Sequence, residues 1–173
     1  MVQTGMVRKI DLLGRIVIPK EIRRSLKINS GDDIEMYIEN DAIVLKKYHM
    51  LDNYFSLAKG YCRTIYENIH THCIICSKDK VVASTQEVGE VQISEKLAQI
   101  IGEGSSRLLS ENQTVPLFDK ISEPKYVSQY ISAINSMGEI YGSIVIYSTK
   151  KALSEQECNF VDIGAVYLCG HVI

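Results

Sequence analysis

The chain has 173 residues, which allows one or two domains, and its content of 46% hydrophobic and 23% charged residues excludes a disordered or low-complexity protein. The formal net charge of −2 excludes a polycation, and no run approaches the roughly 18 apolar residues that a membrane span needs. Five cysteines, an odd and low number, together with a start that lacks the apolar core of an export signal, predict a cytoplasmic protein with free thiols and no membrane partner.

Charge is distributed unevenly along the chain. Residues 1–50 have a net charge of +2 and residues 51–173 a net charge of −4. Within residues 1–30 alone, seven Lys and Arg residues face only two Asp and Glu residues. Such asymmetry suggests a small anion-binding module joined to a neutral or acidic domain. We therefore expect two domains, residues 1–50 and 51–173.

The first domain is predicted to contain short strands around one short helix. Two β-rich runs, residues 6–10 and 15–18, are joined by a turn that ends at Gly14, and Pro19 suits the first position of a helix. In the later hairpin, Ile34, Met36 and Ile38 alternate with polar residues, so we expect these three side chains to face inward. The expected elements are strands 6–10 and 15–18, helix 20–27, and the hairpin strands 34–39 and 42–47.

This first domain is small for a stable core. A domain of about 60 residues buries only about 60% of the surface that its unfolded chain exposes. Residues 1–50 contain no cysteine and no metal-binding motif that could add stability. We therefore expect the domain to be a dimer.

The second domain is predicted to be α+β, an antiparallel sheet with helices on its faces. Its elements follow the order α-β-β-α-β-β-β-α, which differs from the alternation of a parallel sheet. Asp52 is the expected cap of the first helix, and Ser154 with Glu157 forms a capping box for the last. The expected elements are helix 51–69, strands 72–77 and 80–84, helix 93–101, strands 114–117, 126–135 and 139–148, and a helix from residue 154 to near the end.

The last helix is apolar on two sides. One side repeats at spacings of three and four residues, and a second side adds further apolar residues. One side can cover the sheet while the other meets another chain, although both sides could also pack within one domain. The first side comprises Cys158, Val161, Ala165, Leu168 and Val172, and the second Phe160, Ile163 and Tyr167.

The second domain shows no motif for catalysis, a cofactor or a metal. Cys73 and Cys76 have the spacing of a metal or redox pair, but in a strand positions i and i+3 point to opposite faces. We interpret them as core cysteines. No nucleophile and base or paired-carboxylate arrangement stands out, so we predict no enzymatic activity, no metal and no identifiable cofactor.

The helix over residues 20–27 suggests a function. Its cations include Lys20 with Arg24 and Arg23 with Lys27, like-charge pairs at i, i+4 that each cost an isolated helix about 0.2–0.5 kcal/mol. A dense positive face can bind DNA phosphates and groove edges. A solvated helix face is the alternative interpretation.

Residues 5–47 resemble the swapped-hairpin DNA-binding domain of the AbrB family of transition-state regulators. The resemblance rests on three stretches, residues 5–11, 13–26 and 31–35. It implies that two chains exchange hairpins to build one β-barrel. The length and element order of residues 51–173 resemble a GAF domain, and a branch of the family pairs these two domains and acts late in spore formation. The resemblance thus implies a transcriptional regulator, activator or repressor, whose second domain senses an unidentified small molecule or drives oligomerisation.

The resemblance also implies which residues contact double-stranded DNA. Family members use arginines at the positions of Arg8, Arg15, Arg23 and Arg24, and Lys9 is a further candidate. The family often binds loosely defined A/T-rich sites, which corresponds to recognition through shape and deformability. We expect a homodimer through the first domain and a homotetramer through the second.

Two other functions are weighed against this one. An antitoxin of the same hairpin class would bind its toxin through an extended, poorly folded tail, whereas roughly 120 residues here have a periodic apolar pattern. An enzyme would need a catalytic constellation that the sequence does not show. Whether the second domain binds a ligand or only drives oligomerisation stays open.

Overall fold

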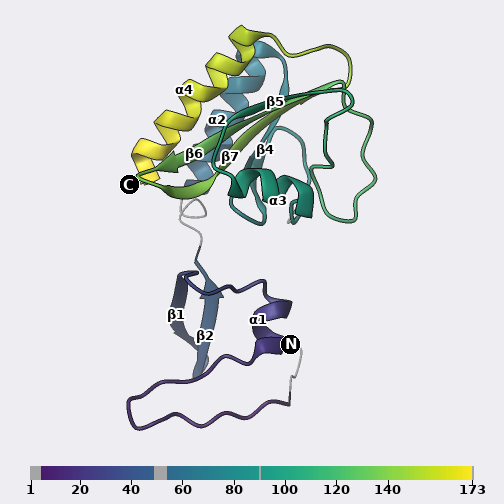
Figure 1. Cartoon of the computed structure of the whole chain (residues 1–173). Helices are drawn as coiled ribbons and strands as arrows, with labels where there is room; N and C mark the ends of the chain where they lie inside the picture. Colours follow the sequence, from purple (N-terminus) through teal and green to yellow (C-terminus); the bar gives the residue numbers. More distant parts are fainter. Residues whose placement is uncertain (1–4, 49–53, 90, 173) are drawn as a thin grey trace. The chain divides into compact units, whose positions relative to one another are not determined.

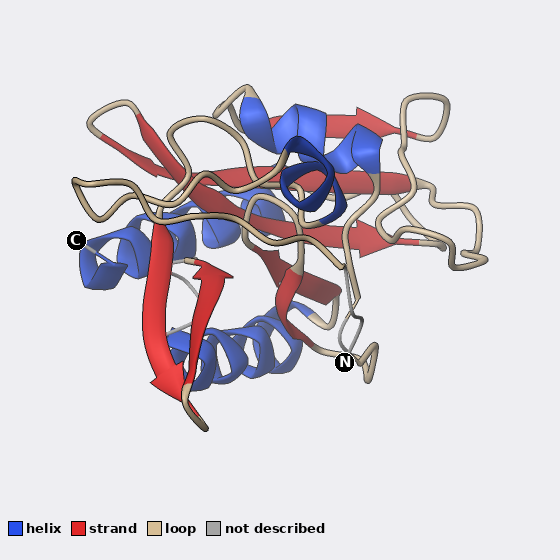
Figure 2. Cartoon of the chain, turned by 90° about the horizontal axis from the view of Figure 1, so that it is seen from below, coloured by secondary structure: helices blue, strands red, loops and turns tan. Residues whose placement is uncertain are grey.

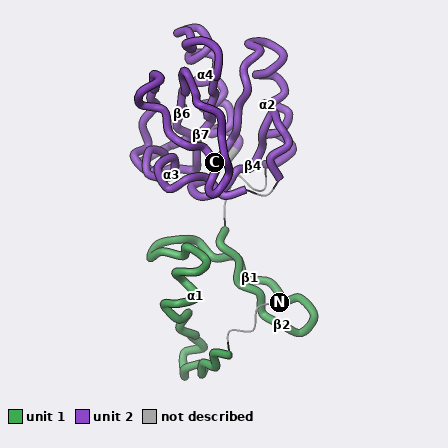
Figure 3. Tube along the Cα trace, turned by 90° about the vertical axis from the view of Figure 1, so that its right-hand side faces the viewer, with its two compact units in different colours: residues 1–48 green, residues 49–173 purple. Residues whose placement is uncertain are grey.

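The computed structural model describes residues 5–48, 54–89 and 91–172, and the chain divides into two units (Figure 3). Unit 1 is Met1–Tyr48 and unit 2 is His49–Ile173. The domain boundary that we predict after residue 50 falls within residues 49–53, outside the described residues.

Unit 1 contains a short helix, α1 (Lys20–Ser25), and an antiparallel hairpin of β1 (Ile34–Glu39) and β2 (Ala42–Lys47). Asn40 and Asp41 connect the strands, with φ angles of 47° and 60°. Positive φ at both residues is typical of the two-residue turn that matches the twist of a hairpin. The predicted hairpin is therefore confirmed.

The strands predicted over residues 6–10 and 15–18 are wrong for this structure. The turn between them is present, because the Gly14 amide donates to the Asp11 carbonyl and the Asp11 amide to the Arg15 carbonyl, both at 3.0 Å. The flanking segments, however, pair with no strand of the described chain, and a strand requires a hydrogen-bonded neighbour. Helix α1 also ends earlier than predicted, and Pro19 precedes it as the N-cap residue instead of occupying its first position.

The hairpin does not bury the side chains that we expect to face inward. Met36 is 71% exposed and Ile38 is 82% exposed, while Ile34 is half-buried. None of the described residues of unit 1 is buried. A two-stranded sheet has no second layer within the unit, so its apolar face is uncovered.

Unit 2 is built on a five-stranded sheet in the order β4-β3-β7-β6-β5, and each neighbouring pair is antiparallel. Helices α2 and α4 cover one face of this sheet and α3 covers the other (Figures 1 and 2). The predicted α+β architecture is therefore confirmed. The strands are β3 (His72–Cys76), β4 (Val81–Ser84), β5 (Arg107–Ser110), β6 (Ser128–Ser136) and β7 (Glu139–Ser148), and the helices are α2 (Phe55–Ile69), α3 (Glu95–Gly102) and α4 (Glu155–Val172).

Both faces of the sheet are buried at its central strands, and strand β3 shows why. Cys73 and Ile75 pack against α2 and α4, whereas Ile74 and Cys76 pack beneath α3. All four are fully buried. Successive side chains of a strand point to opposite faces, so a strand between two layers requires the continuous apolar run seen here.

Most predicted elements of unit 2 are confirmed, but the third strand is placed wrongly. The strand is β5, not residues 114–117. In that segment the Val115 amide donates to the Gln129 side chain and the Leu117 amide to the Glu123 carboxylate, both at 2.9 Å. These side chains take the place of a neighbouring strand. The predicted cap Asp52 lies outside the described residues.

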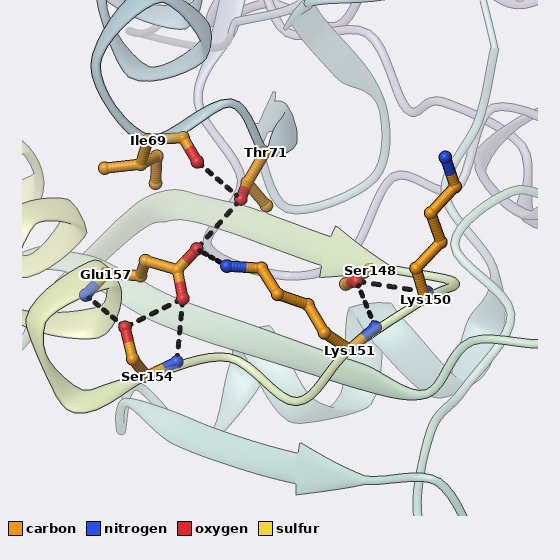
Figure 4. Close-up of polar contacts among 7 residues, drawn as sticks. All are labelled: Ile69, Thr71, Ser148, Lys150, Lys151, Ser154 and Glu157. Atoms are coloured by element: carbon orange, nitrogen blue, oxygen red, sulfur yellow. Dashed lines mark hydrogen bonds and ion pairs between the residues drawn. The ribbon is translucent and has the colours of Figure 1, made fainter.

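Helix α4 begins at the predicted capping box, which is part of a larger network (Figure 4). The Ser154 amide donates to Glu157 Oε2 at 2.8 Å, and the Glu157 amide donates to Ser154 Oγ at 3.3 Å. The nearly buried Glu157 carboxylate also accepts from Lys151 Nζ at 2.8 Å and Thr71 Oγ1 at 3.2 Å. Burial alone would raise the pKa of Glu157, but the Lys151 ammonium and the Ser154 and Thr71 donors lower it to about 2.

Helices α2 and α4 touch closely at Tyr61 and Gly164. A Cβ atom added to Gly164 would overlap the Tyr61 hydroxyl, so only glycine fits at this position. The Tyr61 hydroxyl donates to the Phe160 carbonyl at 3.2 Å. This contact fixes which flank of α2 faces α4.

Candidate nucleic-acid interface

Helix α1 presents two of the predicted DNA-contacting arginines. Arg23 and Arg24 are exposed on a helix that has no buried residue. Among the described residues, no carboxylate lies within ion-pairing distance of either guanidinium. Both positive charges are therefore available to an anionic partner.

The turn before α1 holds a third predicted residue, Arg15. The Asp11 carboxylate accepts the amides of Leu13 at 2.9 Å and Arg15 at 2.8 Å, and it pairs with Arg15 Nε at 2.7 Å. The Arg15 amide and then its guanidinium lower the pKa of Asp11. Asp11 therefore orients Arg15, whose side chain is still 71% exposed. This role of Asp11 was not predicted, although an Asp at the start of a turn is a known signal for such bonding.

Arg8 and Lys9 lie in the extended segment that precedes the turn. Both are exposed, and the Arg8 guanidinium donates to the Val7 carbonyl at 3.0 Å. Within the described chain, no hydrogen bond or ion pair joins these two side chains to α1. The structure thus groups Arg23 with Arg24 on one helix and places Arg15 at a tight turn, but it does not tie Arg8 or Lys9 to them.

An ion pair with little solvent exposure anchors the loop that follows α1. Lys47 Nζ on β2 lies 3.2 Å from Asp32 Oδ2 and also donates to the Lys27 carbonyl at 3.1 Å. The Asn29 amide donates to the same Asp32 oxygen at 2.7 Å. These bonds connect the end of the basic helix to the hairpin. This ion pair was not predicted, because its partners are fifteen positions apart and follow no local spacing rule.

In unit 2 the cysteines form core contacts. All five are buried and none is in a disulfide. Cys73 and Cys76 lie on opposite faces of the sheet, as the strand geometry predicts. A hydrogen bond with Cys62, followed by burial, raises the pKa of Cys73, and burial raises the pKa of Cys76. Over the described ranges no group of three or more His, Cys, Asp or Glu side chains could hold a metal, and no helix there could cross a membrane.

Two family models match the chain and together span both units. Residues 54–172 match the model described as "Stage V sporulation protein T C-terminal, transcription factor". Residues 7–51 match the model described as "Antidote-toxin recognition MazE, bacterial antitoxin". The first match alone covers well over half of the chain.

Curated relatives point the same way. Stage V sporulation protein T of Bacillus subtilis (strain 168) is 35% identical over 173 residues, which is 97% of this chain and 97% of that protein. The transition state regulatory protein AbrB of the same organism is 54% identical over 48 residues, which is 28% of this chain and 50% of AbrB.

Solved structures identify the fold of the second unit. The GAF domain of a phosphoenolpyruvate-protein phosphotransferase from Coxiella burnetii has a TM-score of 0.52 at 16% identity, covering 68% of this chain and 81% of that one. A free methionine-R-sulfoxide reductase from Thermoplasma acidophilum has a TM-score of 0.55 at 16% identity, covering 70% and 94%. At these identities the likeness concerns the fold alone, and it is that of a GAF domain.

Proposed function

The chain belongs to the stage V sporulation protein T family of transcription factors, and from this premise we propose that it regulates sporulation genes by binding double-stranded DNA through unit 1. We propose that residues 1–50 are the DNA-binding domain and that residues 51–173 are a domain for sensing or assembly. The contacts come from Arg8, Lys9, Arg15, Arg23 and Arg24. We propose that the protein binds DNA in the cytoplasm and that it is not an enzyme.

The observation that carries this proposal is the set of uncompensated cations on α1. Arg23 and Arg24 are exposed and have no carboxylate partner among the described residues. Arg15 is held at a turn by Asp11 with most of its side chain in solvent. Exposed guanidinium groups fixed on a turn and a helix suit phosphate contacts, which position a protein on the duplex.

The proposal is tested by mobility shifts of a DNA duplex with four single variants, Arg8→Ala, Arg15→Ala, Arg23→Ala and Arg24→Ala. Each should weaken binding while leaving the melting temperature nearly unchanged, because each side chain is exposed. Lys46→Ala is the matched control, since Lys46 is an exposed cation on β2 of the same unit. Wild-type affinity in all four variants would show that the basic helix is simply solvated.

Unit 1 also carries the surface of an obligate dimer. Among the described residues of this unit, twelve large apolar side chains are at least 40% exposed, and an uncovered area of this kind marks an interaction surface. We expect two chains to pair so that the segments 6–10 and 15–18 gain strand neighbours, which is the swapped-hairpin barrel. These side chains are Met6, Val7, Ile10, Leu12, Leu13, Ile16, Val17, Leu26, Met36, Tyr37, Ile38 and Ile43.

Helix α4 supports assembly of dimers into a tetramer. Ile163 is 70% exposed, Val166 is 74% exposed and Tyr167 is 50% exposed, whereas the opposite side of α4 is buried in the core. Replacing Val166 with Glu should leave a dimer held by unit 1, as measured by analytical ultracentrifugation. Lys96→Glu, which puts the same side chain at an exposed position on α3, away from α4, is the control. A tetramer that persists in Val166→Glu would place the contact elsewhere.

An antitoxin role is the alternative that shares the same first domain. The match of residues 7–51 to the MazE antitoxin model is consistent with it. The match of residues 54–172 to a transcription factor model, and the folded core of unit 2, favour the regulator. Co-purification with a small basic toxin would favour the antitoxin.

A further inference from the structure

A groove in unit 2 lies between helix α2 and strand β4, at one edge of the sheet. Its volume is about 610 Å³, within the range of small-molecule sites. Tyr61 bonds to α4 and does not line the groove. The groove therefore runs along the side of α2 that faces away from α4. Its lining includes two aromatic residues, two cations and two serines: Phe55 and Tyr66, Lys59 and Arg63, and Ser56 and Ser84.

Two cations line this groove from adjacent turns of α2. Lys59 and Arg63 are at i, i+4, a spacing that puts two like charges on one face and destabilises a helix. Arg63 Nε pairs with Glu67 Oε1 at 2.7 Å, whereas the described part of the chain offers Lys59 no carboxylate within ion-pairing distance. The groove lining itself contains no acidic residue. An anion between Lys59 and Arg63 would relieve their repulsion.

The hydroxyl groups of the groove add hydrogen-bond donors. Ser84 Oγ accepts the Gln86 amide at 3.1 Å, which leaves its O–H free to donate. Thr85, in contrast, already donates to the Cys73 carbonyl at 3.2 Å. Cations together with a hydroxyl donor match the acceptor oxygens of a phosphate.

The groove also offers an aromatic surface and space. Tyr66 stacks on His72 at a ring distance of 5.2 Å and meets the His70 ring edge-on at 6.5 Å, and it is 45% exposed, so part of its ring is accessible to a planar partner. Gly60 lies between the two cations in sequence, and a Cβ atom added there would meet nothing within 4 Å. A side chain at this position would therefore extend into the groove without a clash at its Cβ atom.

We propose that this groove binds a small phosphate ester with a planar ring, its phosphate between Lys59 and Arg63 and its ring against Tyr66. The inference deepens the proposed sensing role of unit 2, because it names the ligand class and the site. It does not depend on DNA binding, since every residue involved lies in unit 2. A direct measurement of ligand binding therefore tests this inference separately from the proposal that unit 1 binds DNA.

The test is isothermal titration calorimetry of the full chain at low salt with three probes: adenosine 5′-monophosphate, adenosine and inorganic phosphate. We expect saturable binding of the monophosphate, and weaker binding of the two probes that lack either the phosphate or the ring. Lys59→Gln should weaken monophosphate binding about fivefold, the effect of losing one exposed charge pair. Glu67→Gln should strengthen it by releasing Arg63.

Two further variants keep the test decisive. Gly60→Leu fills the groove without a clash at Cβ and should abolish monophosphate binding while unit 2 stays folded by circular dichroism. Lys96→Gln, an exposed lysine on α3 outside the groove, should change nothing. No saturable binding of the monophosphate, or binding that Lys59→Gln and Gly60→Leu leave at the wild-type level, would overturn the proposal.

Discussion

In unit 2 the sheet has a helix layer on both faces, whereas in unit 1 the hairpin β1–β2 has none of its described residues buried. Ile38 of the hairpin is 82% exposed, and Ile144 of β7 is fully buried. Both are apolar residues of antiparallel strands. The difference teaches that the described residues of the first unit form no buried core, which supports the proposed pairing with a second chain, whereas the second unit has a core of its own.

The largest expected effect is the loss of a core side chain in unit 2. Leu168 on α4 is fully buried, so Leu168→Ala should lower the free energy of unfolding by about 3 kcal/mol, because apolar burial is lost and a cavity forms. Urea denaturation followed by circular dichroism measures this change. Asn159→Ala, exposed on the same helix, should stay within about 0.5 kcal/mol. Equal losses in both variants would contradict the assignment of the core.

The next effect concerns the uncovered face of unit 1. Ile38→Asp should weaken dimerisation of the full chain by about a hundredfold, because it puts a charge where we propose that a second chain packs. The unfolding of unit 2 should not change. Glu35→Gln, an exposed position of opposite parity on β1, should leave the dimer intact. Sedimentation at several protein concentrations separates these outcomes, and an unchanged dimer in Ile38→Asp would refute the proposed interface.

A smaller effect lies at the start of α4. Glu157→Gln should cost about 1–2 kcal/mol at neutral pH, because the network loses its charge-assisted bonds. The pKa of Glu157 is lowered to about 2 in the folded protein, so the stability from its charge is present above the ordinary glutamate pKa of about 4.5. It is lost as the pH falls from about 4.5 to about 2.

That pH dependence provides its own control. The wild-type chain and Glu157→Gln should differ most above pH 4.5 and converge toward pH 2 in thermal unfolding. A difference in melting temperature that does not shrink on acidification would show that the Glu157 charge is not the stabilising feature.

Local patterns predicted much of the fold. The capping box at Ser154 and the periodicity of α2 are signals within a few residues, and both are confirmed. The position of β5 has no such local signal. The strand predicted over residues 114–117 does not form, because this segment is bonded by the side chains of Gln129 and Glu123 from elsewhere in the chain. The alternation of apolar and polar residues in β1 predicts one apolar face, but it does not predict what covers that face.

The candidate site was predictable to a similar extent. The basic residues of α1 stand out in the sequence through their density, and the structure leaves them exposed. The role of Asp11 needs the turn geometry, and the pair of Asp32 with Lys47 needs the fold. The groove beside α2 was not predicted, because it depends on Ser84 of β4 lying near Lys59 of α2, and these two residues are far apart in the sequence.

The most direct test of DNA binding by unit 1 is the salt dependence of its affinity. If Arg8, Arg15, Arg23 and Arg24 of both chains in a dimer contact phosphates, about eight phosphates are neutralised, and the slope of log K against log salt concentration should be about −7. Arg23→Ala should bind more weakly to many sequences, and its slope should be shallower by about one for each phosphate that the variant no longer neutralises. Lys46→Ala should keep the wild-type slope. A properly folded Arg23→Ala variant with wild-type affinity and slope would contradict the account.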